Sequence, residues 1–210
     1  MSNVEAFTPP RPESPLHHAD LPVLAGLPGD GQVVLQEHAL WGHWILRGNG
    51  DDPAFVHGVA AATGLSLPVK PLTSATAAQD PATPGTMLWW LGPDEWLLLA
   101  PPAAWEATAQ ALVTRPSSHS AVVDVSGGQT WLSLSGPKAG LVLAKSTTYD
   151  IHPRAFPVGK CVGTRFAEIQ VFLRRQGPEQ FQLVVRRSFA DYLWLWLQDA
   201  SWEYGLTIRA

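Results

Sequence analysis

The spacing of apolar residues in the first half of the chain predicts two kinds of element. Short apolar runs bounded by Gly, Pro or Asn are typical of strands, whereas apolar residues that recur every three or four positions are typical of helices. The first pattern predicts strands at Val33–Leu35 and Trp41–Arg47. The second predicts a helix that starts at Pro53, with Asp52 as its N-cap, and stops at Gly64.

A Gly-Pro turn followed by an acidic residue occurs twice, each time between two apolar runs. The copies are L-G-P-D-E-W-L-L-L at Leu91–Leu99 and Q-G-P-E-Q-F-Q-L-V at Gln176–Val184, 85 positions apart. Pro presets φ at a turn and Gly relaxes it, so each copy predicts a β-hairpin. A helical pattern follows each copy, from Pro102 and from Ser188. The repeated order indicates an internal duplication.

The remaining elements of the second half follow the order of the first. They are predicted at Val122–Val125, Thr130–Leu134, a helix start at Ser135-Gly136-Pro137, Ala167–Arg175, Phe181–Arg187, a helix capped by Ser188, and Leu206–Arg209. Each half therefore contains strand, strand, helix, strand, strand and helix. This order predicts an α+β fold of two pseudo-repeated half-domains, with antiparallel sheets and helices packed on one face.

The predicted domain organisation is an arm followed by one folded unit. Residues 1–20 contain four prolines and few apolar groups, which predicts an extended Pro-rich arm. Residues 21–210 are expected to form one unit, with half-domains at about 30–115 and 118–210.

Composition adds that the chain is poor in charge and rich in tryptophan. Charged residues make up 15% of the chain, whereas roughly a quarter is typical of globular proteins. Tryptophan occurs ten times, and this residue is favoured in cores and at protein interfaces. The combination favours a protein that buries surface against partners.

The net charge and the cysteine content indicate which partners and which cellular compartment to expect. A formal net charge of −4 argues against nucleic acid as a partner. The single cysteine, Cys161, fits a reducing compartment. The chain shows neither a signal-peptide pattern nor an apolar run near the roughly 18 residues that a membrane span needs. We therefore expect a cytoplasmic protein that binds neither nucleic acid nor membrane.

Candidate interface residues come from the tryptophans and the only basic cluster. In the last helix, Trp194 and Leu195 fall off the main apolar face, so one of them is expected to meet another subunit unless the other half-domain covers Trp194. The basic cluster consists of four arginines that flank the second hairpin. They are expected to form either a solvated rim or a site for an anion or acidic partner. The full set of interface candidates is Trp89, Trp90, Trp194, Leu195, Arg174, Arg175, Arg186 and Arg187.

No arrangement of residue types in the sequence predicts a catalytic, cofactor or metal site in this chain. His38 and His43 are not at zinc-ligand spacing. The Ser, His and Asp residues between 117 and 124 lack a nucleophile elbow. The Gly-Asn-Gly loop at 48–50 is followed by two aspartates, which repel phosphate. Cys161 is predicted to be buried and inert rather than activated by nearby cations.

Five segments together resemble the gamma subunits of heterotetrameric sarcosine oxidase. The segments are E-S-P-L-H-H at Glu13–His18, L-G-P-D-E-W-L-L-L at Leu91–Leu99, D-V-S-G-G-Q-T-W-L-S-L-S-G-P-K-A at Asp124–Ala139, D-I-H-P-R-A-F-P-V-G-K-C at Asp150–Cys161 and R-R-S-F-A-D-Y-L-W at Arg186–Trp194. The wider group is the folate-binding aminomethyltransferase family, which includes the glycine-cleavage T-protein. The resemblance implies a T-protein-like fold.

The resemblance also implies an assembly with alpha, beta and delta subunits that oxidises sarcosine. In such an assembly FAD, FMN, NAD, zinc and tetrahydrofolate are expected on the other subunits, and this chain is expected to be a non-catalytic scaffold. A related folate-fold motif, Lys-Gly-Cys-Tyr followed by Gly-Gln-Glu, is only partly present around Cys161. The alternatives are a stand-alone folate-binding aminomethyltransferase-like protein and a general interaction module.

Overall fold

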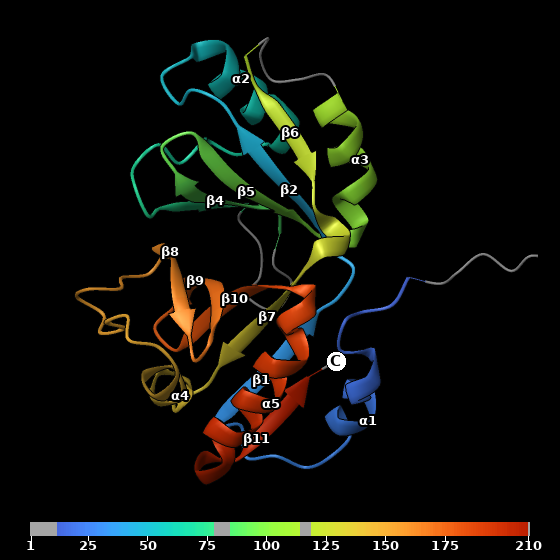
Figure 1. The fold of residues 1–210 in the computed structure, drawn as a ribbon, viewed down its shortest axis with the longest axis vertical. Coiled ribbons are helices and arrows are strands. Elements are labelled where there is room, and N and C mark those ends of the chain that lie inside the picture. The colour runs from blue at the N-terminus through green and yellow to red at the C-terminus, as the bar shows by residue number, and fades with distance from the viewer. Residues whose placement is uncertain (1–11, 78–84, 114–118, 210) are drawn as a thin grey trace, which may run out of the picture.

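Two β-sheets lie face to face, with helices on their outer faces (Figure 1). The computed structural model describes residues 12–77, 85–113 and 119–209. The upper sheet has the order β3-β4-β5-β2-β6 and the lower sheet the order β11-β1-β7-β10-β9-β8. The predicted α+β class with antiparallel sheets is confirmed, with the addition of one parallel pair, β1 and β11.

The upper sheet carries the first hairpin and two helices. Its elements are β2 (Gly42–Arg47), α2 (Pro53–Thr63), β3 (Ser74–Thr76), β4 (Met87–Gly92), β5 (Glu95–Ala100), α3 (Pro102–Val113) and β6 (Ala121–Asp124). Along β5 the side chains alternate. Trp96 and Leu98 face the helices, whereas Leu97 and Leu99 face the lower sheet. Both faces of this sheet are therefore buried.

The lower sheet carries the second hairpin and three helices. Its elements are α1 (Leu21–Ala25), β1 (Val33–His38), β7 (Gln129–Ser135), α4 (Ala139–Ser146), β8 (Cys161–Phe166), β9 (Ile169–Gly177), β10 (Gln180–Arg186), α5 (Ala190–Ser201) and β11 (Leu206–Arg209). In the described ranges, four short 3-10 helices complete the list, η1 (His17–Ala19), η2 (Ser126–Gly128), η3 (Arg187–Phe189) and η4 (Trp202–Tyr204). The core between the two sheets is rich in aromatic residues, with Trp41, Trp89 and Trp131 at its centre.

The two halves exchange their first strands. Strand β1 pairs with β7 in the lower sheet, where Val34 lies opposite Ser135. Strand β6 pairs with β2 in the upper sheet, where Trp44 lies opposite Asp124. The resulting orders, β3-β4-β5-β2-β6 and β8-β9-β10-β7-β1, are equivalent. The duplication seen in the sequence is thus present in the topology, but each sheet takes one strand from the other half.

The N-terminal arm is only partly as predicted. Residues 1–11 lie outside the described residues. In the remainder, Leu16 is 1% exposed and belongs to the core of the lower sheet, and η1 follows directly. The Ser14 hydroxyl also donates to the Glu37 carboxylate. Because Leu16 is buried in this core, residues 12–20 pack against the fold and do not form a free extended arm.

Helix α2 begins as the sequence predicts. The Asp52 carboxylate accepts a hydrogen bond of 2.9 Å from the Ala54 main-chain N–H, and Pro53 occupies the first turn. The helix ends at Gly64, whose φ of 71° suits glycine.

The Asp52→Ala variant is expected to lower the free energy of unfolding by about 1 kcal/mol, because it leaves a first-turn N–H without its cap. Urea denaturation measures this change. Asp51→Ala, which removes the neighbouring exposed carboxylate, is the control and should change the free energy by less than about 0.5 kcal/mol. Equal losses in the two variants would contradict the assignment of the cap.

The start of α5 differs from the prediction that Ser188 caps it. Ser188 lies within η3, and α5 begins at Ala190 with Phe189 at the N-cap position. Asp191, in the first turn of α5, lies 2.7 Å from His18 Nε2 of the N-terminal segment. The turn of 3-10 helix moves the N-cap position one residue along, from Ser188 to Phe189, so Ser188 does not cap α5.

Candidate functional site

A cavity of about 580 Å³ opens at one end of the junction between the two sheets. Its walls come from the arm at 12–15, the β1–β2 turn, the first turn of α3, and the segment from η2 into β7. Cavities of a few hundred cubic ångströms are typical of small-molecule sites. The two short turns that carry β1 and β6 across to the opposite sheets place these segments side by side.

His43 lines this cavity and is 1% exposed. Its Nδ1 lies 3.1 Å from Gln129 Oε1, so Nδ1 carries the proton and donates to the amide oxygen. Burial lowers the pKa of His43 to about 4, although Gln129 and the nearby Asp124 carboxylate act in the opposite direction. The imidazole is therefore neutral near pH 7.

His38 and Trp41 line the cavity as well. The His38 ring stacks on Trp131 behind it in the core, with centroids 3.6 Å apart and planes 4° from parallel. Trp41 meets both rings edge-on, at 6.0 Å from His38 and 4.9 Å from Trp131. Burial lowers the pKa of His38 to about 4, so this ring is also neutral near pH 7. Trp105 of α3, 45% exposed, borders the cavity as well.

Ser126, Asp124 and His43 lie together but do not form a proton relay. The Ser126 hydroxyl donates to Asp124 Oδ1 at 2.5 Å and accepts from the His43 main-chain N–H at 3.0 Å. The His43 ring bonds to Gln129 instead of to the serine. A nucleophilic serine needs a ring nitrogen as its base. This arrangement therefore fixes the turn rather than activating a nucleophile. Ser117 and Ser118 lie outside the described residues.

Of the tryptophan candidates, Trp89 and Trp194 are buried within the chain. Trp89 is 0% exposed and lies in the core between the sheets, since it points inward from β4. Trp194 is 4% exposed and packs in the lower core. It borders a groove lined by α1 and β11. The pattern of apolar residues in the last helix does not show that these two elements pack beside α5. Neither ring is available to a partner, and Trp90 is half-buried.

Arg174 and Arg175 also correct the expectation of a surface cluster. Arg174 is 7% exposed and bonds to Ser74 at 2.7 Å, Thr76 at 2.8 Å and Gln182 at 2.7 Å, so it ties β9 to β3 of the other sheet. Arg175 is 6% exposed and donates to four main-chain carbonyls. Because both sheet faces are covered, an arginine on either face of β9 becomes buried.

Three predicted interface residues remain at the surface. Arg186 and Arg187 are exposed, and Arg187 donates to the Glu13 main-chain carbonyl at 3.3 Å. Leu195 is 56% exposed on the outer side of α5. The arginine group therefore divides into one buried pair and one exposed pair.

Cys161 is 1% exposed, which confirms the prediction that it is buried. Its thiol donates to the Thr73 carbonyl at 3.1 Å. Burial raises the pKa of the Cys161 thiol to about 12, despite the nearby Arg174 cation. The reactive thiolate form is thus strongly disfavoured at neutral pH.

The sequence pattern did not identify Trp105 and Trp202 as candidate site or interface residues. It also did not predict that His38 and His43 line one cavity. The two histidines flank a predicted turn between strands, which was the available signal for their proximity. Within the described residues no group of three or more His, Cys, Asp or Glu side chains is placed to hold a metal ion. In the same part of the chain, no helix has the length and hydropathy needed to cross a membrane.

Comparison with known proteins gives consistent results. A model of the sarcosine oxidase, gamma subunit family matches residues 47–203. The sarcosine oxidase gamma subunit of Corynebacterium sp. strain U-96 is 36% identical over 183 residues, which are 86% of this chain and 85% of that protein. The corresponding subunit of Corynebacterium sp. strain P-1 is 38% identical over 147 residues, 70% of each protein.

Solved structures agree with this result. A chain of heterotetrameric sarcosine oxidase from Corynebacterium sp. U-96 superposes with a TM-score of 0.76 and 35% identity, covering 91% of this chain and 95% of that chain. The aminomethyltransferase T of the glycine cleavage system from Bartonella henselae matches with a TM-score of 0.57 and 16% identity. The latter match covers 85% of this chain and 47% of the other, and it shows the shared T-protein-like fold alone.

Proposed function

Because the chain belongs to the sarcosine oxidase gamma subunit family, we propose that it is the non-catalytic structural subunit of a heterotetrameric sarcosine oxidase. The observation that carries this proposal is the match of 91% of the chain to a chain of such an oxidase. The reaction of the assembly is the oxidation of sarcosine by O2 and water to glycine, formaldehyde and H2O2. With tetrahydrofolate, the one-carbon unit leaves as 5,10-methylenetetrahydrofolate.

A structural role is supported by the state of the candidate reactive groups. The Cys161 thiol is held protonated by burial, and the neutral His43 ring is bonded to Gln129. Arg174 and Arg175 are engaged in internal hydrogen bonds. The partners in this proposal are alpha, beta and delta subunits, which would hold FAD, FMN, NAD, zinc and tetrahydrofolate in a cytoplasmic complex.

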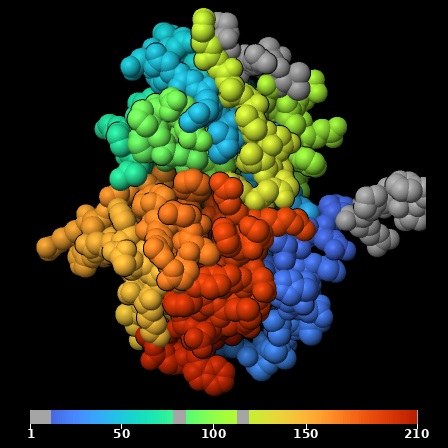
Figure 2. Space-filling view, viewed as in Figure 1, coloured from blue at the N-terminus to red at the C-terminus, as the bar shows by residue number. Residues whose placement is uncertain are grey.

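The outer face of α5, continued by Trp202 at its C-cap, is the surface that we propose contacts another subunit. Leu195 and Trp202 are seven positions apart, or two helical turns, so they lie on one side, with the exposed Asp199 between them. Leu195 is 56% exposed and Trp202 is 86% exposed. Figure 2 shows α5, in red, lying across one face of the lower half. Tryptophan is enriched among the residues that anchor protein interfaces, and the exposed Leu195 beside it adds apolar area to the same surface.

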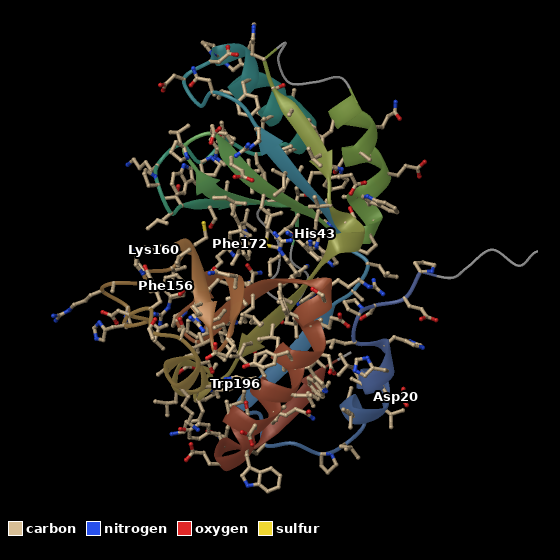
Figure 3. The ribbon with its side chains drawn as sticks, viewed as in Figure 1. Asp20, His43, Phe156, Lys160, Phe172 and Trp196 are labelled. Carbon is tan, nitrogen blue, oxygen red and sulfur yellow. The ribbon has the colours of Figure 1, made fainter. Side chains whose placement is uncertain are left out.

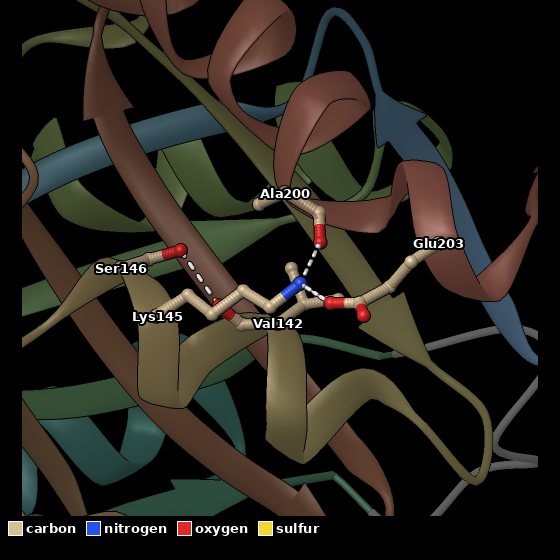
Figure 4. A network of polar contacts seen from close by, with 5 residues as sticks. All are labelled: Val142, Lys145, Ser146, Ala200 and Glu203. Atoms are coloured by element: carbon tan, nitrogen blue, oxygen red, sulfur yellow. Dashed lines mark hydrogen bonds and ion pairs between the residues drawn. The ribbon is translucent and has the colours of Figure 1, made fainter.

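A polar network holds the end of α5 in place. Lys145 of α4 donates to the Ala200 carbonyl at 3.0 Å and pairs with the Glu203 carboxylate (Figure 4). Its ammonium group also lies 4.4 Å from the centre of the Tyr204 ring. Since Glu203 follows Trp202 directly, this network fixes the backbone that presents the exposed indole.

Replacing both Leu195 and Trp202 with aspartate is expected to lower recovery of the other subunits at least tenfold. The measurement is affinity purification of the tagged chain after co-expression with the other oxidase subunits, followed by an assay of sarcosine-dependent H2O2 release. The two changes remove apolar anchors and place charge in the contact. Since both side chains are exposed, the thermal transition of the isolated chain should stay within a few degrees of the wild type.

Leu141→Asp is the matched control, because Leu141 is 46% exposed on α4. This variant should co-purify with the other subunits as well as the wild type does. If the wild-type chain recovers no other subunit, the proposed function is wrong. If the double variant recovers as much as the wild type, the function stands and the interface lies elsewhere.

A further inference from the structure

We infer that the loop between α4 and β8, residues 147–160, is a preformed binding element that docks into an apolar, carboxylate-bearing site on another subunit of the oxidase. The inference rests on the proposed function, because the partner belongs to that assembly. Figure 2 shows this gold to orange segment projecting to the left from the lower half of the molecule. It shares no residue with the outer face of α5.

The loop is long and contains no helix or strand, yet its backbone is fixed from within. It spans the 14 residues between α4 and β8. Loops of this length are uncommon in compact domains, and the ordered ones are usually functional. Main-chain hydrogen bonds close its turns, from the Phe156 N–H to the His152 carbonyl at 2.8 Å and from the Lys160 N–H to the Pro157 carbonyl at 3.1 Å. The length therefore indicates a function beyond connecting two elements.

Two cationic side chains and one aromatic ring hold the loop against the second hairpin. The Arg175 guanidinium donates to the Ile151 and Phe156 carbonyls, at 3.1 Å each. Lys160 Nζ donates to the Ala155 carbonyl at 2.8 Å. The Phe156 ring is 0% exposed, and Figure 3 shows it with Lys160 where the loop meets the sheet. Because the loop is already ordered, it loses little conformational entropy when it binds a partner.

The outer part of the loop presents apolar side chains around one unpaired cation. Pro153, Pro157 and Val158 are exposed, and Val158 is 57% exposed. Arg154 is exposed as well, and among the described residues its guanidinium takes part in no hydrogen bond or ion pair. A guanidinium offers five N–H donors and no acceptor. The surface is therefore suited to a partner that supplies apolar contact and an acceptor for this cation.

The charge of the loop differs in sign from that of the whole chain. Its one carboxylate, Asp150, accepts from the His152 main-chain N–H at 2.9 Å, and its two cations are Arg154 and Lys160. The formal net charge of residues 147–160 is thus +1, whereas the whole chain carries −4. A positive projection on a negative chain favours an acidic partner surface.

The His152 ring adds a second donor beside the guanidinium. The Arg154 main-chain N–H donates to His152 Nδ1 at 3.3 Å, so in the neutral ring Nε2 carries the proton. A carboxylate accepts from both an imidazole N–H and a guanidinium, and it binds the planar guanidinium in a fixed fork. A carboxylate within an apolar site is therefore the partner chemistry that fits this loop.

The first test is maleimide labelling of a Val158→Cys variant. The native Cys161 is 1% exposed and burial raises its pKa to about 12, so the introduced thiol is the one that reacts. We expect fast labelling of the isolated chain and a rate at least tenfold lower in the oxidase purified after co-expression. Val69→Cys is the matched control, because Val69 is 55% exposed, and its rate should be the same in both samples.

The outcomes separate this inference from the proposed function. An unchanged rate for Val158→Cys in the oxidase would overturn the inference and leave the proposed function in place. Equal slowing at both positions would overturn it too, since assembly would then shield the chain as a whole. Slow labelling of the isolated Val158→Cys chain would assign the loop to contact with a second copy, which also overturns it. If the wild-type chain recovers no other subunit, the proposed function is wrong and the inference falls with it.

The second test is the charge reversal Arg154→Glu, measured by affinity purification after co-expression with the other oxidase subunits. We expect the recovery of at least one other subunit to fall at least tenfold, because two carboxylates would then face each other. Lys70→Glu makes the same change of charge at an exposed lysine before β3 and should leave recovery unchanged. Recovery by Arg154→Glu equal to that of the wild type would overturn the assignment of an acidic partner site.

Discussion

The Arg175→Met variant is expected to lose about 4 kcal/mol of unfolding free energy, a large part of the stability of a chain of this size. Arg175 is 6% exposed, and its guanidinium donates to the carbonyls of Gly177, Ile151, Phe156 and Pro178. Methionine fills much of the same volume but supplies no donor. Each buried carbonyl left without a partner costs roughly 1–3 kcal/mol, and partial access of water reduces the sum.

Urea denaturation followed by tryptophan fluorescence measures this loss. Arg186→Met is the matched control, because Arg186 is exposed on the next strand and should change stability by less than about 0.5 kcal/mol. Arg175→Lys, which keeps the charge but not the planar fork, should fall between the two. An Arg175→Met variant as stable as Arg186→Met would show that the guanidinium does not hold the loop at 151–156 against the second hairpin.

Acidification from pH 7.5 to pH 5 is expected to cost about 2 kcal/mol of stability for each of His38 and His43. Both histidines have a folded-state pKa of about 4, below the ordinary value of 6.5. Between these two values the unfolded chain binds more protons than the folded chain. The stabilisation is therefore complete above pH 6.5 and is lost progressively as the pH falls towards 4.

Comparison of urea unfolding at the two pH values tests this dependence. His43→Gln removes one buried titrating ring, so its loss on acidification should be smaller than that of the wild type by about 2 kcal/mol. His57→Gln removes an exposed ring and is the control for the loss of a histidine outside the core. If His43→Gln and the wild type lose the same stability, the His43 ring does not titrate below its ordinary range in the folded protein.

Much of the local structure was predictable because it depends on neighbouring residues. The Asp52 cap, the Gly64 stop and the two Gly-Pro hairpins are local signals, and the structure places an element at each. The hairpin offset also identified the duplication. The strand exchange was not predictable in this way. The residues around a short turn do not determine which of the two sheets the next strand joins.

The candidate site was predicted less well, since exposure depends on packing between distant elements. Arginines on a β-hairpin are commonly solvated, but Arg174 meets Ser74 and Thr76 of the opposite sheet. Trp194 departs from the main apolar face of its helix and is nevertheless covered, because α1 and β11 pack beside it. The cavity at His43 combines residues from the arm, both halves and the first turn of α3, a combination that spacing along the chain does not reveal.

The exchanged strands have a consequence for the order in which the protein can be completed during synthesis. Strand β1 leaves the ribosome well before its two partner strands, because Val34 pairs with Ser135 and Val33 pairs with Leu206. Until β7 is made, this apolar strand lacks both neighbours, and until β11 is made it lacks one; pairings so distant in sequence form slowly. A nascent chain of this kind presents an aggregation-prone edge while the partner strands are still being translated. Its yield in a foreign host should therefore depend on translation rate and chaperone supply more than on the stability of the finished fold.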